Sequence, residues 1–272
     1  MPGRRIPPEQ VGSAISLYYD GTSLRAITRT FGQAYDSAPS TASVFEWVQD
    51  YTKLAEHELT EYKPHTGHTW VADEIVVKAG GKKYWVWDVM DADSRYLLAT
   101  YVTPNRGTRE AEVVFKRALE KADRPPRVIV TDKLASYVDG IERVFGSESH
   151  HLQSGGIRSE TNNNLSERLQ GTIRQREKVM RGLKSRESAQ AFMDGWTLPY
   201  NYFGPHESLD GKTPAKAAGI KAPLTDWEMV ARKDVRPFSY KRVRLEKEGL
   251  HEPILVRPRR LADKSFRHRR GF

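Results

Sequence analysis

Apolar side chains in the first sixty residues recur at intervals of three and four, which is the spacing of short amphipathic helices. This spacing predicts helices over residues 9–19 and 24–31, and a third helix that starts with a capping box formed by Ser43 and Glu46. Three short helices in succession are typical of a helix-turn-helix module that binds DNA. The predicted turn of about eight residues is longer than the usual three or four, so a small helical brace is the alternative.

Beyond residue 68 the pattern changes to the short apolar runs of strands, interrupted by two amphipathic helices. The elements follow one another in the order β-β-β-α-β-α-β, and Gly80-Gly81 forms the first hairpin turn. This order predicts an antiparallel meander that continues into a parallel pair of strands through right-handed crossovers. The predicted elements are residues 69–78, 83–91, 95–103, 108–122, 127–132, 134–145 and 150–152.

The last third of the chain is predicted to be largely helical and then irregular. A polar loop over residues 154–163 precedes a long helical region that runs from Asn163 to Tyr202, with a break near Gly182. From Pro205 onward the pattern predicts loop, and the charged C-terminal end is expected to be disordered.

Composition excludes several classes of protein. The 272-residue chain has no cysteine, which excludes disulfides and zinc sites with thiolate ligands. No apolar run approaches the roughly 20 residues of a membrane-spanning helix, and the N-terminus lacks the apolar core of a signal peptide. We therefore expect a cytoplasmic protein that does not associate with a membrane.

The positive charge of the chain is concentrated in two places. The net charge is +9, and residues 231–272 hold 14 Lys or Arg against 5 Asp or Glu, while the residues before them are close to neutral. A second excess lies between Arg168 and Arg186, where Glu177 is the one acid among seven basic residues. Clustered positive charge favours a nucleic-acid partner; a solubilising tail and a solvated helix face are the alternative.

Three acidic residues stand where the local pattern disfavours them. Asp73 interrupts an otherwise apolar strand, and a buried carboxylate is costly unless it is paired or binds a metal. Asp132 ends the most hydrophobic strand, at the edge where open α/β sheets place their ligands. Glu167 lies early in the helix after the polar loop and can lean over that edge.

The repulsion among three converging carboxylates would be relieved by two Mg²⁺ or Mn²⁺ ions about 3.5–4 Å apart. Oxygen ligands in a chain without cysteine favour Mg²⁺ over zinc. Glu74 is a rival of Asp73, but the alternation of side chains along a strand directs it to the opposite face of the sheet. The remaining candidates are interpreted as turn or loop residues: Asp88, Asp91, Asp93 and Glu160.

Five segments, in order, resemble the DDE transposases of bacterial and archaeal insertion sequences, within the retroviral-integrase superfamily. Between Asp132 and Glu167 stand 34 residues, close to the spacing typical of that family. The segments are Trp70–Glu74 (WVADE), Trp87–Arg95 (WDVMDADSR), Val130–Lys133 (VTDK), Asn163–Arg168 (NNLSER) and Tyr200–Leu209 (YNYFGPHESL), which runs on into Gly211–Ala215.

The resemblance implies an α/β fold with an RNase H-like core, in which a mixed five-stranded sheet is flanked by helices. It also implies that a catalytic triad falls on Asp73, Asp132 and Glu167, and that the enzyme cleaves DNA at terminal inverted repeats and joins the freed 3′-hydroxyl to target DNA. The organisation that follows is a helix-turn-helix-like module at 1–62, the catalytic core at 68–220 and a basic tail at 221–272.

Beside this triad the basic residues become candidate contacts to DNA. Those on the helix of Glu167 and one after Asp132 are placed to hold backbone phosphates, which fixes register without reading sequence; a solvated helix face is the alternative. The residues are Lys133, Arg168, Arg174, Arg176, Lys178 and Arg181. Because a transposon has two ends, we expect a homodimer or a larger assembly on DNA.

Two other functions are compatible with the sequence. One is a catalytically inactive or repurposed relative of a transposase that only binds DNA, although the intact set of acids argues against decay. The other is a nuclease of RNase H type that acts on RNA–DNA hybrids, against which the N-terminal helices and the segment Tyr200–Leu209 argue.

Overall fold

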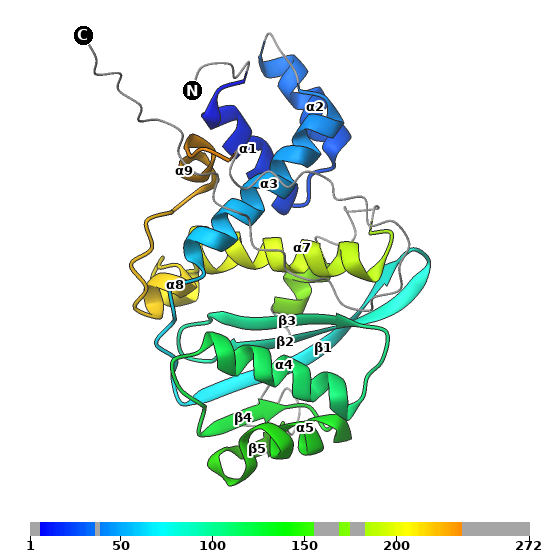
Figure 1. The fold of residues 1–272 in the computed structure, drawn as a ribbon, viewed down its shortest axis with the longest axis vertical. Helices are drawn as coiled ribbons and strands as arrows, with labels where there is room; N and C mark the ends of the chain where they lie inside the picture. Colours follow the sequence, from blue (N-terminus) through cyan, green and yellow to red (C-terminus); the bar gives the residue numbers. More distant parts are fainter. Residues whose placement is uncertain (1–5, 36–38, 155–168, 175–182, 236–272) are drawn as a thin grey trace, which may run out of the picture.

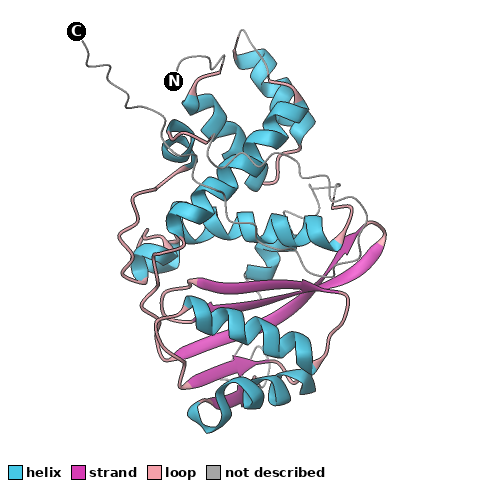
Figure 2. Ribbon diagram, in the orientation of Figure 1, coloured by secondary structure: helices cyan, strands magenta, loops and turns pink. Residues whose placement is uncertain are grey.

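A computed structural model of the chain describes residues 6–35, 39–154, 169–174 and 183–235. Helices cover both faces of one sheet, and the N-terminal helices stand at the end of the molecule beyond α7 (Arg186–Leu198) (Figures 1 and 2). Among the described residues no helix combines the length and the apolar composition needed to cross a membrane.

Five strands form the sheet in the order β3-β2-β1-β4-β5. The first three strands are an antiparallel meander, and β4 and β5 run parallel to β1. This is the mixed sheet of an RNase H-like core, so the predicted fold and element order are confirmed. The strands are β1 (Thr69–Ala79), β2 (Lys82–Asp91), β3 (Leu97–Thr103), β4 (Val128–Thr131) and β5 (His150–Gln153).

The hairpin between β1 and β2 is closed by the predicted glycine pair. Gly80 and Gly81 have φ angles of 56° and 77°, the left-handed conformations that a two-residue hairpin turn needs. Gly80 also lies against the backbone of Lys184, where a Cβ atom would come within 2.3 Å of the carbonyl oxygen. The turn therefore joins the sheet to the chain that leads into α7.

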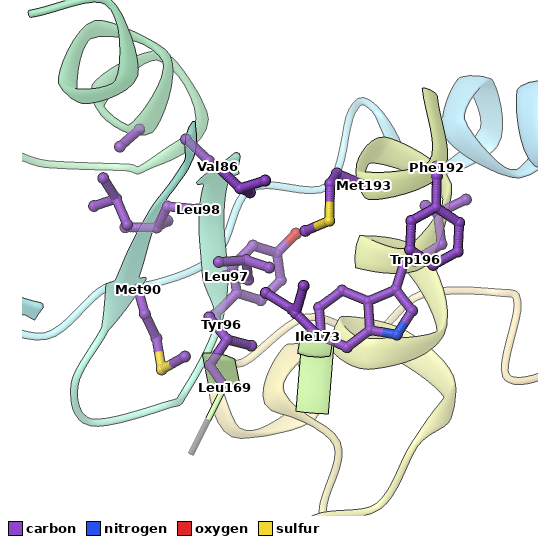
Figure 3. Close-up of a cluster of buried hydrophobic side chains, with 14 of the residues drawn as sticks. Val86, Met90, Tyr96, Leu97, Leu98, Leu169, Ile173, Phe192, Met193 and Trp196 are labelled. Carbon is purple, nitrogen blue, oxygen red and sulfur yellow. The ribbon is translucent and has the colours of Figure 1, made fainter. Parts of the chain in front are cut away.

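The two crossover helices cover one face of the sheet, and α7 covers the other. On the first face Trp70 of β1 packs edge-on against Phe145, with ring centres 5.9 Å apart. On the second face apolar side chains of β2, β3, α7 and the helical residues 169–174 form one buried cluster (Figure 3). The helices are α4 (Thr108–Lys121), α5 (Ala135–Phe145) and α7 (Arg186–Leu198).

The N-terminal helices are α1 (Pro8–Tyr19), α2 (Leu24–Ala34) and α3 (Thr41–Leu59). The predicted capping box at Ser43 is wrong, because the hydroxyl of Ser40 accepts the hydrogen bond of the Ser43 N–H at 3.0 Å and the helix begins three residues earlier than that box implies. The predicted end of α2 at Gly32 is also too early, since the helical bonding continues until Tyr35 N–H donates to Phe31.

The chain after Pro205 is more regular than predicted. Beyond the π-helical turn Pro199–Phe203 come the short helices η3 (Glu207–Leu209), α8 (Pro214–Ala217) and α9 (Trp227–Arg232). The prediction of loop missed two capping signals, because the side chain of Thr213 accepts from Lys216 N–H at 3.2 Å and that of Asp226 from Met229 N–H at 2.7 Å. Helices this short lack the periodic pattern on which the prediction depends.

Helix α9 returns to the N-terminal helices and packs on α1. The rings of Tyr19 and Trp227 stack with centres 5.4 Å apart and planes 13° apart. Gly12 permits this contact, because a Cβ at that position would lie 2.6 Å from the backbone nitrogen of Glu228.

Candidate active site

The parallel pairing of β1 and β4 brings two of the predicted acids to one edge of the sheet. The register aligns Val71 with Val130, and continuing it by two residues sets Asp73 level with Asp132. Strand β4 ends at Thr131, whereas β1 continues to Ala79, so among the strands that the structure describes none pairs with this stretch of β1 on the β4 side. The sheet thus leaves an open edge at which carboxyl groups can meet.

Three carboxyl groups converge at this edge. Oxygen atoms of Asp73, Glu74 and Asp132 all lie within 4.8 Å of one another. Glu74 does belong to the opposite face of β1, as the alternation predicts, and its side chain contacts Tyr137 of α5. The expectation that this orientation keeps Glu74 away from the site is wrong. Strand β4 ends before it reaches the level of Glu74, and the Glu74 carboxyl group lies at the same edge of the sheet as Asp73 and Asp132.

The carboxyl group of Glu74 is held by two donors. Arg106, in the loop before α4, donates from Nε to Oε1 at 2.6 Å and also from Nη2 to the same oxygen. The hydroxyl of Tyr137 donates to Oε2 at 2.6 Å. Both oxygens of Glu74 are therefore engaged by protein groups, and its side chain is only 1% exposed.

Asp132 is more open than Glu74. Its Oδ1 accepts the N–H of Leu134 at 2.8 Å, which fixes the carboxyl group at the start of α5. Its Oδ2 lies 3.5 Å from Nη2 of Arg106, and 41% of its side chain is exposed. One oxygen of Asp132 is thus available at the open edge of the sheet.

The carboxyl group of Asp73 has a raised pKa. Burial raises this pKa to about 7, and the hydrogen bond from the N–H of Glu74 opposes the increase. The negative charges of Glu74 and Asp132 add to the increase. The amide group of Gln170 also opposes the shift, which places residues 169–174 beside Asp73. A divalent cation would reverse this pKa shift, since it favours the ionised form of its ligands.

A fourth acid lies next to Asp73 and was not predicted as a site residue. Asp88, interpreted as a turn residue, lies within β2 directly opposite Asp73 and is fully buried. Both of its carboxyl oxygens lack a hydrogen-bond partner within the described ranges. Burial raises its pKa well above the usual value, and the charges of Asp73 and Glu74 add to the shift. The signal that singled out Asp73, a polar interruption of an apolar strand, also marks Asp88.

Of the remaining predicted site residues, two are exposed on the surface and five lie outside the residues that the structure describes. Lys133 and Arg174 are exposed, and Lys133 directly follows Asp132. The others fall outside the described residues: Glu167, Arg168, Arg176, Lys178 and Arg181. Arg106 and Tyr137 were not predicted, because a loop arginine and a helix tyrosine carry no local signal of their distant partner on β1.

The donor set at this edge suits a hard divalent cation. Asp73 and Asp132 offer carboxylate oxygens, and no cysteine exists in the chain to favour a softer metal. Oxygen atoms of Asp73, Glu74 and Asp132 lie within 4.8 Å of one another, close enough for one cation to reach more than one of them. The residues present therefore fit Mg²⁺ or Mn²⁺ coordination.

Comparison with known proteins agrees with this geometry. A family model described as a DDE domain matches residues 67–203, which is half of the chain. The chain belongs to the DDE transposase family. The matched region of the chain begins just before β1 and includes both Asp73 and Asp132.

A curated relative and several solved structures resemble the chain at low identity. The uncharacterized protein MJ0017 of Methanocaldococcus jannaschii is 25% identical over 114 residues, which span 42% of this chain and half of that protein. The catalytic core domain of HTLV-2 integrase in complex with magnesium is 17% identical, with a TM-score of 0.45 over 57% of this chain and 99% of that one. The catalytic core domain of BIV integrase is 12% identical, with a TM-score of 0.42 over 55% and 91% of the two chains.

Proposed function

We propose that the protein is a DNA transposase that cleaves DNA at the ends of an insertion sequence and joins those ends to target DNA. The observation that carries the proposal is the convergence of Asp73 and Asp132 at one open edge of the sheet, with oxygens within 4.8 Å of each other. Membership of the DDE transposase family supports the reaction class.

In this proposal Asp73, Asp132 and Glu167 hold two Mg²⁺ ions, for which Mn²⁺ can substitute. When bound, such ions activate the attacking oxygen and stabilise the leaving oxygen of a phosphodiester displacement. The protein's part is to fix the ligands. Asp73 is held on a strand, and Asp132 is held by the Leu134 N–H at the start of a helix.

Glu167 is proposed as the third ligand because it precedes Leu169 by two residues in the sequence, and the described residues after it border this site. Leu169 is buried in the cluster on the second face of the sheet (Figure 3). Gln170 lies beside Asp73. Because protein donors engage both oxygens of Glu74, we propose an acid from elsewhere in the chain, and not Glu74, as the third ligand.

The DNA partners of the proposed enzyme are the terminal inverted repeats of the element and a target duplex. We propose that Lys133 and Arg174, which are exposed, contact phosphates together with basic residues that lie outside the described ranges. Those residues are Arg168, Arg176, Lys178 and Arg181. A homodimer or larger assembly would hold two ends at once, and the three-part division at 1–62, 68–220 and 221–272 stays a prediction.

The proposal is tested with full-length protein, a labelled duplex of the genomic DNA that borders the reading frame, and a supercoiled plasmid as target. We expect Mn²⁺-dependent nicking and joined products, and the loss of both in Asp132→Asn. This substitution keeps an oxygen for the Leu134 N–H, so the fold should survive. Asp139→Asn, an exposed acid on α5, is the matched control and should retain the products.

Two other outcomes would assign a different function. DNA binding without cleavage under either metal would indicate a relative of transposases that only binds DNA. Cleavage of an RNA–DNA hybrid in preference to DNA ends would indicate a nuclease of RNase H type. Equal activity of wild type and Asp132→Asn would show that the converging carboxyl groups are not the catalytic centre.

A further inference from the structure

Arg106 stands at the edge of the candidate active site and is fixed there by contacts of three kinds. Its guanidinium donates twice to Oε1 of the buried Glu74. The same group lies 4.6 Å from the centre of the Trp85 ring, within the range of a cation–π contact. Its backbone oxygen accepts the hydroxyl of Ser136 at 3.1 Å, which ties the loop to the start of α5. The side chain is thus held in one orientation.

This orientation leaves part of the guanidinium directed to solvent beside a proposed metal ligand. The Arg106 side chain is 35% exposed, whereas its partner Glu74 is 1% exposed. Nη2 lies 3.5 Å from Oδ2 of Asp132. A guanidinium has five N–H donors, and within the part of the chain that the structure describes no acceptor is found for Nη1. Donors therefore remain for a group that arrives at the open edge.

We infer that Arg106 contacts a backbone phosphate of the DNA strand that is cleaved at this site. The inference rests on the proposed function, because it takes the edge between Asp73 and Asp132 as the place of cleavage. A planar guanidinium matches two phosphate oxygens and stays charged at every relevant pH. A cation fixed before the substrate arrives stabilises the charge that develops on a transferring phosphoryl group.

The competing explanation is that Arg106 serves only to neutralise Glu74. That role requires a positive charge near Oε1 of Glu74. It does not require the Arg106 side chain to be partly exposed, nor its Nη2 atom to lie close to Asp132 as well. Tyr137 already satisfies the other oxygen of Glu74. The two explanations differ in what happens when the charges of Arg106 and Glu74 are removed together.

The test compares Arg106→Gln, Arg106→Lys and the double variant Glu74→Gln/Arg106→Gln, each as the full chain with the bordering genomic duplex. We expect Arg106→Gln to lower the single-turnover cleavage rate by about 100- to 1000-fold. Arg106→Lys should recover part of that loss, because it keeps the charge without the planar fork. The double variant should remain as slow as Arg106→Gln while melting near the wild-type temperature, since no buried charge is left unpaired.

A matched control separates this effect from a general loss of positive charge. Arg143 on α5 pairs with Glu112 at 3.5 Å, away from the edge, and Arg143→Gln should cleave at the wild-type rate. If Glu74→Gln/Arg106→Gln also cleaves at that rate, Arg106 only neutralises Glu74 and the inference is overturned.

The phosphate itself can be located by chemical substitution of the DNA. Single uncharged methylphosphonates are placed in turn around the cleaved bond of the same duplex. At one position we expect wild type to lose activity while Arg106→Gln loses no more, because the contact is already absent. If the loss of activity caused by each methylphosphonate adds in full to the loss caused by Arg106→Gln, at every position tested, the inference is overturned.

The failure of this inference is distinguishable from the failure of the proposed function. If wild-type protein makes no cleaved product with Mg²⁺ or Mn²⁺, the proposed function fails, whatever the variants do. The phosphate contact is still decided by DNA binding alone, where Arg106→Gln should reduce the slope of log affinity against log salt by about one. An unchanged slope would overturn the contact even in an active enzyme.

Discussion

Asp88 on β2 lies directly opposite Asp73 on β1, so that two carboxyl groups share one face of the sheet. Asp73 lies at the edge of the site, whereas Asp88 is fully buried. The pKa values of both carboxyls are raised, in each case first by burial. The strand pair therefore stabilises the protonated form of these acids when no cation is present.

Asp88→Asn is expected to stabilise the protein at alkaline pH and to have less effect near pH 5. A carboxyl whose pKa is higher in the folded than in the unfolded state contributes stability that is lost as the pH rises above its usual value of 3.8. The amide cannot ionise and avoids that loss. Thermal unfolding without metal, at about pH 5 and about pH 8, measures the difference. Each kcal/mol corresponds to roughly 2–4 °C at this chain length.

The exposed turn residue Asp93 supplies the control for this comparison. Asp93→Asn should leave the free energy of unfolding within about 0.5 kcal/mol of wild type at both pH values. If the melting temperature of Asp88→Asn differs from that of wild type by the same amount at both pH values, the pKa of the Asp88 carboxyl is not raised in the folded protein and the explanation is wrong.

Metal binding should depend on pH through Asp73. Its pKa of about 7 means that the metal-free protein loses stability as the pH rises from about 4 to about 7, because the unfolded carboxyl ionises first. A divalent cation competes with the proton for this group. We therefore expect added Mn²⁺ to raise the melting temperature more at pH 8 than at pH 5, and Asp73→Asn to abolish most of the increase. An increase of equal size in Asp73→Asn would place the cation elsewhere.

Tyr137→Phe should destabilise the protein more than Tyr96→Phe does. Both hydroxyls are buried, but that of Tyr137 donates to the Glu74 carboxyl at 2.6 Å, whereas that of Tyr96 pairs with the neutral hydroxyl of Tyr202 at 2.7 Å. Hydrogen bonds to charged groups contribute about 1.5–3 kcal/mol and neutral ones about 0.5–1.5 kcal/mol. Urea unfolding measures both free energies. Equal losses would show that Tyr137 adds nothing beyond an ordinary buried hydroxyl.

Gly12→Ala should loosen α9 from α1. The added methyl group would lie 2.6 Å from the Glu228 nitrogen and 2.7 Å from its Cα, both in the backbone of α9, so the helices must separate. Overpacking of this kind typically costs about 1–3 kcal/mol. Hydrogen exchange of the amides at 227–232 is the measurement, and Ser13→Ala, at an exposed position, is the control. Unchanged protection of these amides in Gly12→Ala would contradict the close packing of α1 and α9.

The periodic pattern of the sequence predicted most of the sheet, because β1 to β4 are largely apolar runs separated by short turns or by an amphipathic helix, whereas β5 (HHLQ) is short and polar. It also predicted that Asp73 and Asp132 reach the same edge, since that follows from strand order. It failed for Glu74, because side-chain alternation says which face a residue belongs to but not where the neighbouring strand ends. That strand end, at Thr131, is a property of the folded sheet.

The helices at the end of the described chain and the residues around Glu74 were beyond the reach of local patterns. A four-residue helix such as α8 shows no periodicity and is revealed only by a cap such as Thr213. Arg106 is 32 residues from Glu74 in sequence, and their pairing depends on the path of the loop between β3 and α4. Neither the short helix α8 nor the pairing of Arg106 with Glu74 changes the spacing of apolar residues, so neither could be predicted from that spacing.

The stacking of Tyr19 on Trp227 has a consequence for biosynthesis. The first helix emerges from the ribosome early, but the ring that covers Tyr19 is made more than two hundred residues later. During that interval the aromatic face of the nascent N-terminal helices is open to chaperones or to a neighbouring chain. A truncation just before Trp227 would make this temporary exposure permanent.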